Sequence, residues 1–398
     1  MEWWMLLIEW VIKSLVLIFA LLGGFAYLTW YERRALARMQ VRLGPNRAGP
    51  EGLLQPVADA IKLIFKEELI PDRAERMLFI LAPILVVVPS VIITATVPWG
   101  PDIPLQWLGI PYTIKPYIAD INVGVLYITA VASIAVYGIV LAGWSSDNKF
   151  AMLGGLRATA QMVSYELSLG FSFVVVILMA GSMSMVDIVK AQQTPLLTLG
   201  FIQIPMWYAF VQPVGMVIFL IATLAELNRA PFDMPEAEQE LTAGYMTEYS
   251  GMKFALFFMG EYTKMIAISA IAAVLFFGGY HGPDITQIPL IGQSDIVIFL
   301  APFMGIVYMV VKVILILFWM IWVRATWPRI RYDRLMAFGW KVMLPLSLAV
   351  VMITAFGIVL GASFGPLAQT GFTFVISLLV GFLVSVLIDR ALRRKMYA

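Results

Sequence analysis

The stretch from Val342 to Ile388, VMLPLSLAVVMITAFGIVLGASFGPLAQTGFTFVISLLVGFLVSVLI, contains no charged residue. A helix needs roughly 20 mainly apolar residues to cross a bilayer, so this run is too long for a single crossing. Pro366 lies in the glycine-bounded segment from Gly361 to Gly371 and predicts a break between two helices. The end of the chain is therefore predicted to cross a membrane twice.

The whole chain has the composition of a membrane protein. It is 61% hydrophobic and 13% charged, with a mean hydropathy of +0.88, and so has too few polar residues to cover a soluble globule. We predict an all-α polytopic membrane protein, a bundle of about nine transmembrane helices. The predicted spans are residues 5–30, 78–99, 120–143, 159–181, 207–227, 254–277, 296–323, 342–361 and 372–389. The first lacks the short core and small-residue cleavage site of a signal peptide, so we expect it to be retained.

Redox ligands are almost missing from the sequence. The chain has no cysteine, and His281 is its single histidine. Alone it cannot ligate an iron–sulfur cluster, a conventional zinc site or a bis-histidine haem, and we predict no metal site. Any redox centre must lie on a partner or be a diffusible carrier.

The basic residues predict the orientation in the membrane. Most of the 27 lysines and arginines lie in alternate connections, residues 31–77, 144–158, 228–253 and 324–341, and in the tail 390–398. The opposite connections and the N-terminal segment hold only Lys13, Lys115 and Lys190. The excess of basic residues on the cytoplasmic side predicts an external N-terminus and a cytoplasmic C-terminus.

The first basic connection contains a second kind of helix. Apolar residues recur at helical spacing between Leu53 and Lys66, while Asp59, Lys62 and Lys66 share the other face. About 14 residues are too few to span the bilayer. We predict an amphipathic helix lying in the cytoplasmic interface.

Carboxylates crowd between two predicted spans, in AELNRAPFDMPEAEQELTAGYMTEYSGMKFALFFMGEY, residues 225–262. Asp233 can cap a helix with Glu236 three residues on, and Glu236 and Glu240 then share one face. If partly buried, these two glutamates would raise each other's pKa, which suits proton exchange. A solvated acidic loop is the other interpretation, and it stays open for Glu238 and Glu248.

Further ionisable residues lie inside the predicted spans. Glu166, in AQMVSYELSLG, is an isolated carboxylate that can be part of an ion pathway or a buried hydrogen bond to a neighbouring helix. Glu261 and Lys264 are three residues apart and can neutralise each other or belong to a proton path. Lys312, near the middle of its helix, is expected to face a carboxylate from another span.

Four segments carry a family resemblance: ERRALARMQVRLGPNRAGPEGLLQPVADAIKLIFKE, AQMVSYELSLG, the 225–262 segment and WVRATWPRIRYDRLMAFGWK. They resemble the H subunit of the proton-pumping NADH:quinone oxidoreductase, called ND1 in mitochondrial respiratory complex I, in order over about residues 10–362. Many members end after eight spans and some bacterial ones have one more. The resemblance thus implies a quinone-module membrane domain at 1–362 and an additional helix with a basic cytoplasmic tail at 363–398.

The resemblance also implies an activity. The chain would be an enzyme subunit of the bacterial cytoplasmic membrane that forms a quinone access tunnel and part of the quinone site at the junction with the peripheral arm. Buried carboxylates would couple reduction of ubiquinone or menaquinone to proton translocation. FMN and iron–sulfur clusters would belong to partner subunits, among which are the peripheral quinone-site subunits and antiporter-like membrane subunits. No nucleic acid is implied.

Site residues follow from the resemblance in three groups. Those at the quinone access region are Arg33, Arg34, Arg38, Arg42, Arg47, Asp59 and Lys62. Those in proton coupling are Glu166, Glu226, Glu236, Glu240 and Glu261, to which the Glu261–Lys264 spacing adds Lys264. Those that would hold the peripheral arm are Arg329, Arg331, Asp333 and Arg334.

Two other functions compete. A related subunit of a membrane-bound hydrogenase, or of a dehydrogenase with another donor, shares the bundle without needing a quinone; the segment RLGPNRAGPEGLLQPVADAIKL favours the quinone type. An autonomous ion transporter is the third possibility. No charged motif recurs in the two halves, whereas inverted repeats are common in transporters.

Overall fold

Long helices make up most of the protein in a computed structural model that describes residues 3–104, 112–199, 202–234, 244–282 and 295–396. Within these ranges, eight helical segments are long and apolar enough to cross a membrane, which confirms the all-α membrane class. The long helices are α1 (Trp3–Met39), α3 (Arg76–Ile92), α4 (Gly124–Ser145), α5 (Lys149–Ala180), α10 (Gly251–Phe276), α11 (Asp295–Thr326), α13 (Leu344–Phe364) and α14 (Pro366–Met396).

Shorter elements connect them. The short helices are α2 (Gln55–Ile64), α6 (Met185–Ala191), α7 (Tyr208–Val211), α8 (Pro213–Glu226) and α12 (Tyr332–Phe338). Single turns are η1 (Pro50–Gly52), η2 (Ile93–Thr96), η4 (Gly244–Met246) and the π-helical η6 (Gly339–Met343). Two antiparallel hairpins pair β1 (Ile103–Pro104) with β2 (Thr113–Ile114) and β3 (Pro195–Leu199) with β4 (Ile202–Pro205).

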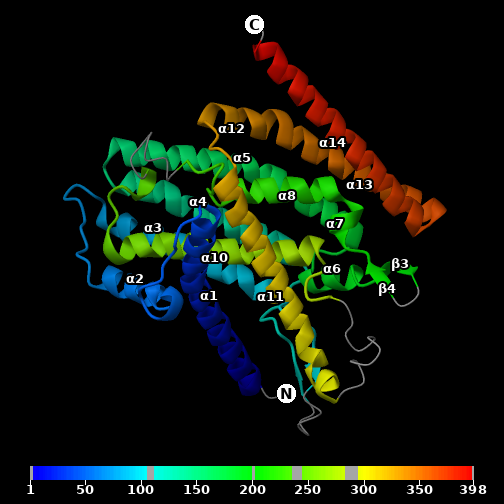
Figure 1. Ribbon diagram of the computed structural model, residues 1–398, viewed down its shortest axis with the longest axis horizontal. Coiled ribbons are helices and arrows are strands. Elements are labelled where there is room, and N and C mark those ends of the chain that lie inside the picture. The colour runs from blue at the N-terminus through cyan, green and yellow to red at the C-terminus, as the bar shows by residue number, and fades with distance from the viewer. Residues whose placement is uncertain (1–2, 105–111, 200–201, 235–243, 283–294, 397–398) are drawn as a thin grey trace.

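The helices form a bundle around α10. Helices α3, α4, α5, α8 and α10 run roughly side by side, whereas α1 and α11 cross them at a steep angle (Figure 1). In an apolar stretch of 18 residues in α10, 78% of the residues are buried. In the corresponding stretch of α1, only 6% are buried. Helix α10 is therefore the centre of the bundle, and α1 packs on its outside, in contact with α10 and α11.

The predicted fifth span, residues 207–227, is not one continuous helix. Gln212 leaves the helical conformation between α7 and α8, because Pro213 has no N–H and disfavours the α conformation at the residue before it. Helix α8 is about 21 Å long, less than the roughly 30 Å of the bilayer core. The prediction of a single fifth span was wrong in this respect.

The predicted break between the last two helices is confirmed. Gly365 follows α13 with a φ of 93°, and α14 begins at Pro366. The two helices pack closely because glycines face the partner: a Cβ added to Gly357 would lie 2.2 Å from Thr373 Cγ2. Helix α14 also contacts α7 and α8, so it is part of the bundle. The division of the chain into a quinone-module domain at 1–362 and an additional segment at 363–398 stays a prediction.

The amphipathic helix predicted between Leu53 and Lys66 is present as α2, against α1 and α10. Its outer apolar side chains, among them Val57, Ile61 and Ile64, are more than half exposed in the chain alone. Such a surface suits contact with lipid or a neighbouring subunit.

Lys312 on α11 does not face a carboxylate among the residues described, and that expectation was wrong. Its ammonium donates to three backbone carbonyls beyond the end of α10, those of Phe277 (2.6 Å), Gly279 (2.7 Å) and His281 (2.5 Å). An ammonium has three donors, and carbonyls at a helix end lack partners within the helix. Lys312 therefore fastens α11 to the end of α10.

Candidate functional site

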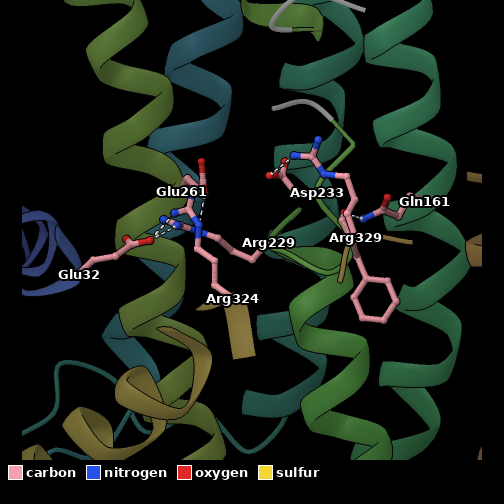
Figure 2. A network of polar contacts seen from close by, with 8 residues as sticks. Glu32, Gln161, Arg229, Asp233, Glu261, Arg324 and Arg329 are labelled. Carbon is pink, nitrogen blue, oxygen red and sulfur yellow. Dashed lines mark hydrogen bonds and ion pairs between the residues drawn. The ribbon is translucent and has the colours of Figure 1, made fainter. Parts of the chain in front are cut away.

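A buried network of ion pairs joins α1, α10, α11 and the segment after α8 (Figure 2). Arg229 Nη1 lies 2.8 Å from Glu32 Oε1 on α1, and Arg229 Nε lies 2.6 Å from Glu261 Oε1 on α10. Arg324 on α11 also pairs with Glu32. Two carboxylates and two guanidinium groups thus form a cluster without net charge, in which Arg229 and Glu32 are almost fully buried.

Arg229 is the centre of this network. Its guanidinium carbon lies 4.5 Å from the centroid of the Tyr262 ring, a position that favours a cation–π interaction. Burial alone would lower the pKa of Arg229, but the carboxylates of Glu261 and Glu32 outweigh it and hold that pKa above its ordinary value. Arg229 therefore remains a fixed positive charge between two acidic side chains.

A second buried pair lies next to the network. Glu226, the last residue of α8, places Oε1 2.9 Å from Lys264 Nζ on α10, and both side chains are less than a tenth exposed. Of the two interpretations left open for Glu261 and Lys264, mutual neutralisation is therefore wrong. Their spacing along α10 would allow it, but Glu261 reaches Arg229 and Lys264 reaches Glu226.

Two small cavities are both lined by the Glu226–Lys264 pair. One, of about 40 Å³, is bounded by this pair and also by Asp233 and Glu261. The other, of about 30 Å³, is bounded by the same pair and by Glu166. A water molecule needs about 10–15 Å³ of such space, so each cavity has room for water. Polar groups and water-sized spaces therefore continue from Glu261 to Glu166.

Glu166 itself lies on α5 and accepts a hydrogen bond from the Ser133 hydroxyl on α4. A buried hydrogen bond to a neighbouring helix was one of the two interpretations of Glu166 from the sequence, and the structure contains that bond. The same carboxyl group also borders the smaller cavity. The two interpretations of Glu166 are thus compatible.

The segment after α8 is held in place by two further side chains, Gln161 and Arg329 (Figure 2). Gln161 Nε2 on α5 donates to the carbonyls of Ala225 (2.8 Å) and Phe232 (2.7 Å). Arg329 Nη2 lies 3.0 Å from Asp233 Oδ2. These contacts fix both ends of the segment that presents Arg229, and Asp233 is engaged by Arg329.

A larger cavity of about 880 Å³ lies between α1 and α11, with walls from Ile266 of α10 and from the connection after β2. Its walls are mainly apolar. Tyr27, Trp30 and Tyr31 of α1 line one end, immediately before Glu32, and Lys13 and Lys115 line the other. The cavity thus has an aromatic end beside the buried network and a basic end far from it.

Comparison with known proteins identifies the family. A family model described as NADH dehydrogenase matches residues 12–355. The H subunit of NADH-quinone oxidoreductase from Thermomicrobium roseum is 47% identical over 354 residues, which cover 89% of this chain and 97% of that protein. The chain belongs to the H subunit family of NADH-quinone oxidoreductase. The H subunits of Rhodospirillum rubrum (47% identity, 87% of this chain and 92% of that protein) and Deinococcus deserti (45%, 92% and 88%) agree with this.

Membership in the H subunit family makes the chain an integral membrane subunit of an enzyme complex, as the resemblance implied. Among the residues that the structure describes, no three His, Cys, Asp or Glu side chains gather as a metal site would require. The sequence also lacks the cysteines of an iron–sulfur site.

The predicted quinone-access residues of this H subunit family member separate into two sets. Arg33 Nη1 lies 2.6 Å from Asp59 Oδ2, and Arg34 Nη2 lies 2.7 Å from Glu51 Oε2, so these pairs tie α1 to α2 and to the turn before it. The other side chains are at least partly exposed: Arg38, Arg42, Arg47 and Lys62.

The predicted proton-coupling residues come together in part. Glu166, Glu226, Glu261 and Lys264 border the two small cavities. Glu236 and Glu240 lie outside the described residues, as does the capping box that Glu236 would complete.

Of the predicted peripheral-arm contacts, Arg329 binds Asp233 of the same chain, whereas the other three are at least partly exposed: Arg331, Asp333 and Arg334.

Three residues of the network, Glu32, Arg229 and Arg324, were not among the predicted site residues. A signal for them exists in the sequence. Glu32 and Arg324 follow the first and seventh predicted spans, Arg229 follows the fifth, and Glu261 lies near the start of the sixth, so all four occur on the predicted cytoplasmic side. Opposite charges that share one membrane depth in a charge-poor chain are expected to pair.

Proposed function

We propose that this chain forms the access path for quinone in its NADH-quinone oxidoreductase and couples quinone reduction to proton translocation through its buried carboxylates. The observation that carries the proposal is the continuity from Glu32 and Arg229 through Glu261 and the Glu226–Lys264 pair to Glu166. Reduction of a quinone to the quinol takes up two protons, so its site must be served by groups that supply them.

The chemistry of the large cavity supports the quinone part of the proposal. Its aromatic end, at Tyr27, Trp30 and Tyr31, is apolar enough for the tail of a lipid-soluble quinone. Glu32 and Arg229 follow directly, and they offer a carboxylate and a guanidinium to a polar headgroup. The paired residues Arg33 and Asp59 fix α2 at the side of this path.

The coupling part follows from electrostatics at short range. A charge that appears on the quinone near Glu32 and Arg229 changes the proton affinity of Glu261, because interacting buried groups titrate as a unit. Glu261 and Glu226 border the same cavity, and Glu226 and Glu166 border the next. Each step can therefore pass a proton or a rearranged hydrogen bond to its neighbour.

The partner subunits have the remaining tasks in this proposal. The iron–sulfur clusters belong to the peripheral subunits in this proposal, because this chain lacks the cysteines that such clusters need, and FMN is assigned to those subunits by the family resemblance. The side chains of Arg331 and Arg334 are available for contact with the peripheral arm. Antiporter-like membrane subunits would continue the path beyond Glu166.

We expect Arg42→Ala to impair quinone access selectively. Arg42 is exposed in the basic connection after α1, and its replacement removes a fixed charge and five donors. The apparent KM for quinone should rise several-fold, while electron transfer from NADH to a soluble artificial acceptor is unchanged. Steady-state assays of the assembled complex with both acceptors measure this.

Arg73→Ala is the matched control, since Arg73 is an exposed arginine of the same connection to which no quinone role is assigned. It should leave both activities unchanged. Equal loss of both activities in the Arg42 variant would mean an assembly defect and would remove the support for its role in quinone access.

The proposed orientation, with the N-terminus outside and the C-terminus cytoplasmic, predicts a labelling pattern. Single cysteines can be placed at Ala48 and Ser363, because the native chain has none. A membrane-impermeant thiol reagent should label the Ala48 position only from the cytoplasmic side and the Ser363 position only from outside. Labelling of both positions from one side contradicts the proposed topology.

A further inference from the structure

The large cavity is a long slot on one face of α1. Lys13, Ala20, Gly24 and Tyr31 line it and recur at intervals that place them on the same side of the helix. The distance from Lys13 to Tyr31 along the helix is about 27 Å, close to the roughly 30 Å of a bilayer core. The slot therefore follows α1 over a length comparable to the thickness of a bilayer core.

The slot is open to the surrounding lipid along its length. Val16 on α1, and Val310 and Ile314 on α11, line it and yet are between about two-fifths and two-thirds exposed. A flexible apolar chain can therefore lie between α1 and α11 and remain continuous with the bilayer. Such a chain would be held by van der Waals packing against these walls, because the bilayer around it is already apolar and burial adds no hydrophobic term.

Two lysines lie at one end of the slot, Lys13 and Lys115. Lys13 is paired with Glu9, one turn earlier on α1. Lys115 lines the same end of the slot, is exposed, and forms no ion pair among the residues described. Asp102 and Asp120 lie close enough to act on Tyr117, which also lines the slot, so the cation that this end can offer to a phosphate is the exposed ammonium of Lys115.

We propose that this slot binds an anionic phospholipid, with an acyl chain between α1 and α11 and the phosphate at Lys13 and Lys115. The charge of the basic end matches an anionic headgroup, and the apolar walls match the chain below it. The quinone proposed above uses the aromatic end at Tyr27 to Tyr31, so the two molecules would occupy opposite halves of one slot. The lipid would close the half that the quinone does not use.

Photo-crosslinking tests the proposal on the assembled complex in lipid nanodiscs. The probe is phosphatidylglycerol with a diazirine in its acyl chain, and mass spectrometry locates the labelled peptides. We expect labelling of α1 and α11 peptides in the native complex. Lys115→Gln should reduce that labelling about fivefold, because it removes the exposed ammonium at the headgroup end of the slot.

Two further variants complete the test. Lys190→Gln removes an exposed lysine outside the slot, at the end of α6, and should leave the labelling unchanged. Ala20→Phe adds an aromatic ring to the slot wall and should also reduce labelling at α1 and α11. None of these residues belongs to the buried network, so native gels of the solubilised membranes and electron transfer from NADH to a soluble artificial acceptor should report intact assembly in each variant.

Several results would overturn the proposal. One is equal labelling of α1 and α11 by phosphatidylglycerol and phosphatidylcholine probes, which would exclude a selective headgroup site. Unchanged labelling in Lys115→Gln would exclude the basic end as its cause. Loss of labelling when a long-tailed quinone is added would assign the whole slot to the quinone tail. The quinone proposal itself is tested by the Arg42 variant and does not depend on these outcomes.

Discussion

Replacement of Glu166 by Gln is expected to reduce quinone-linked turnover by about 100-fold, the lower end of what a positioned proton-transfer group contributes. Gln keeps the shape of the side chain and can still accept the hydrogen bond from Ser133, but it cannot ionise. The complex should therefore assemble normally. Proton pumping and quinone reduction should fall together, because a blocked proton step stalls electron transfer in a tightly coupled machine. Reconstituted vesicles measure both, proton pumping with a pH-sensitive dye and turnover through the absorbance of NADH.

Two comparisons separate this result from a structural defect. Glu166→Asp keeps the ionisable proton and should retain more activity than the Gln variant. Glu248→Gln is the matched control, because Glu248 also accepts a hydrogen bond, from Asn148 Nδ2 at 2.7 Å, but does not border either small cavity. A Glu166→Gln complex with normal rate and an unchanged proton-to-electron ratio would leave Glu166 as an ordinary interhelical hydrogen-bonding group.

The architecture could be predicted from sequence because bilayer thickness imposes a length on every crossing helix. Long apolar stretches then identify the spans, and Gly365 and Pro366 identify the break between α13 and α14. The fifth span shows where this argument fails. A length criterion does not register that Pro213 removes an N–H and interrupts the helix, although the residues on both sides are apolar.

Pairing between charges was harder to predict than their presence. Local spacing suggested an ion pair between Glu261 and Lys264. A side chain on a central helix can also reach partners on several neighbouring elements, and these two residues pair with Arg229 and Glu226 instead. The same holds for Lys312, whose partners are backbone carbonyls at the end of α10. Every residue has such a carbonyl, so the sequence does not indicate which ones accept a hydrogen bond from a lysine. Charges buried in a membrane protein are paired as a rule, but the tertiary contacts decide with what.

Arg229→Leu is expected to have the largest effect on stability. Arg229 is the cation shared by the carboxylates of Glu32 and Glu261, and its removal from a buried ion pair typically costs about 3–5 kcal/mol. We therefore expect little assembled complex in membranes that contain this variant, and a lower melting temperature for the part that assembles. Native gels of solubilised membranes measure the first, and thermal unfolding of the purified complex measures the second.

The matched control is Arg73→Leu, since Arg73 is an exposed arginine to which no contact with quinone or with the peripheral arm is assigned. An exposed ion pair contributes about 0–1 kcal/mol, so loss of an exposed arginine should leave this variant assembling like the native chain. Arg229→Lys should lie between the two arginine-to-leucine variants, because a lysine keeps the charge but lacks the planar fork that reaches two carboxylates at once.

A double variant tests the physical reason for the expected loss. In Arg229→Leu with Glu261→Leu, the cation and one of its carboxylates are both replaced by apolar groups, and Arg324 remains for Glu32. If the defect of the single variant comes from buried carboxylate charge left behind, the double variant should recover a substantial part of the assembled complex. A double variant as unstable as Arg229→Leu alone would show that packing of the guanidinium, for instance against the Tyr262 ring, matters more than its charge.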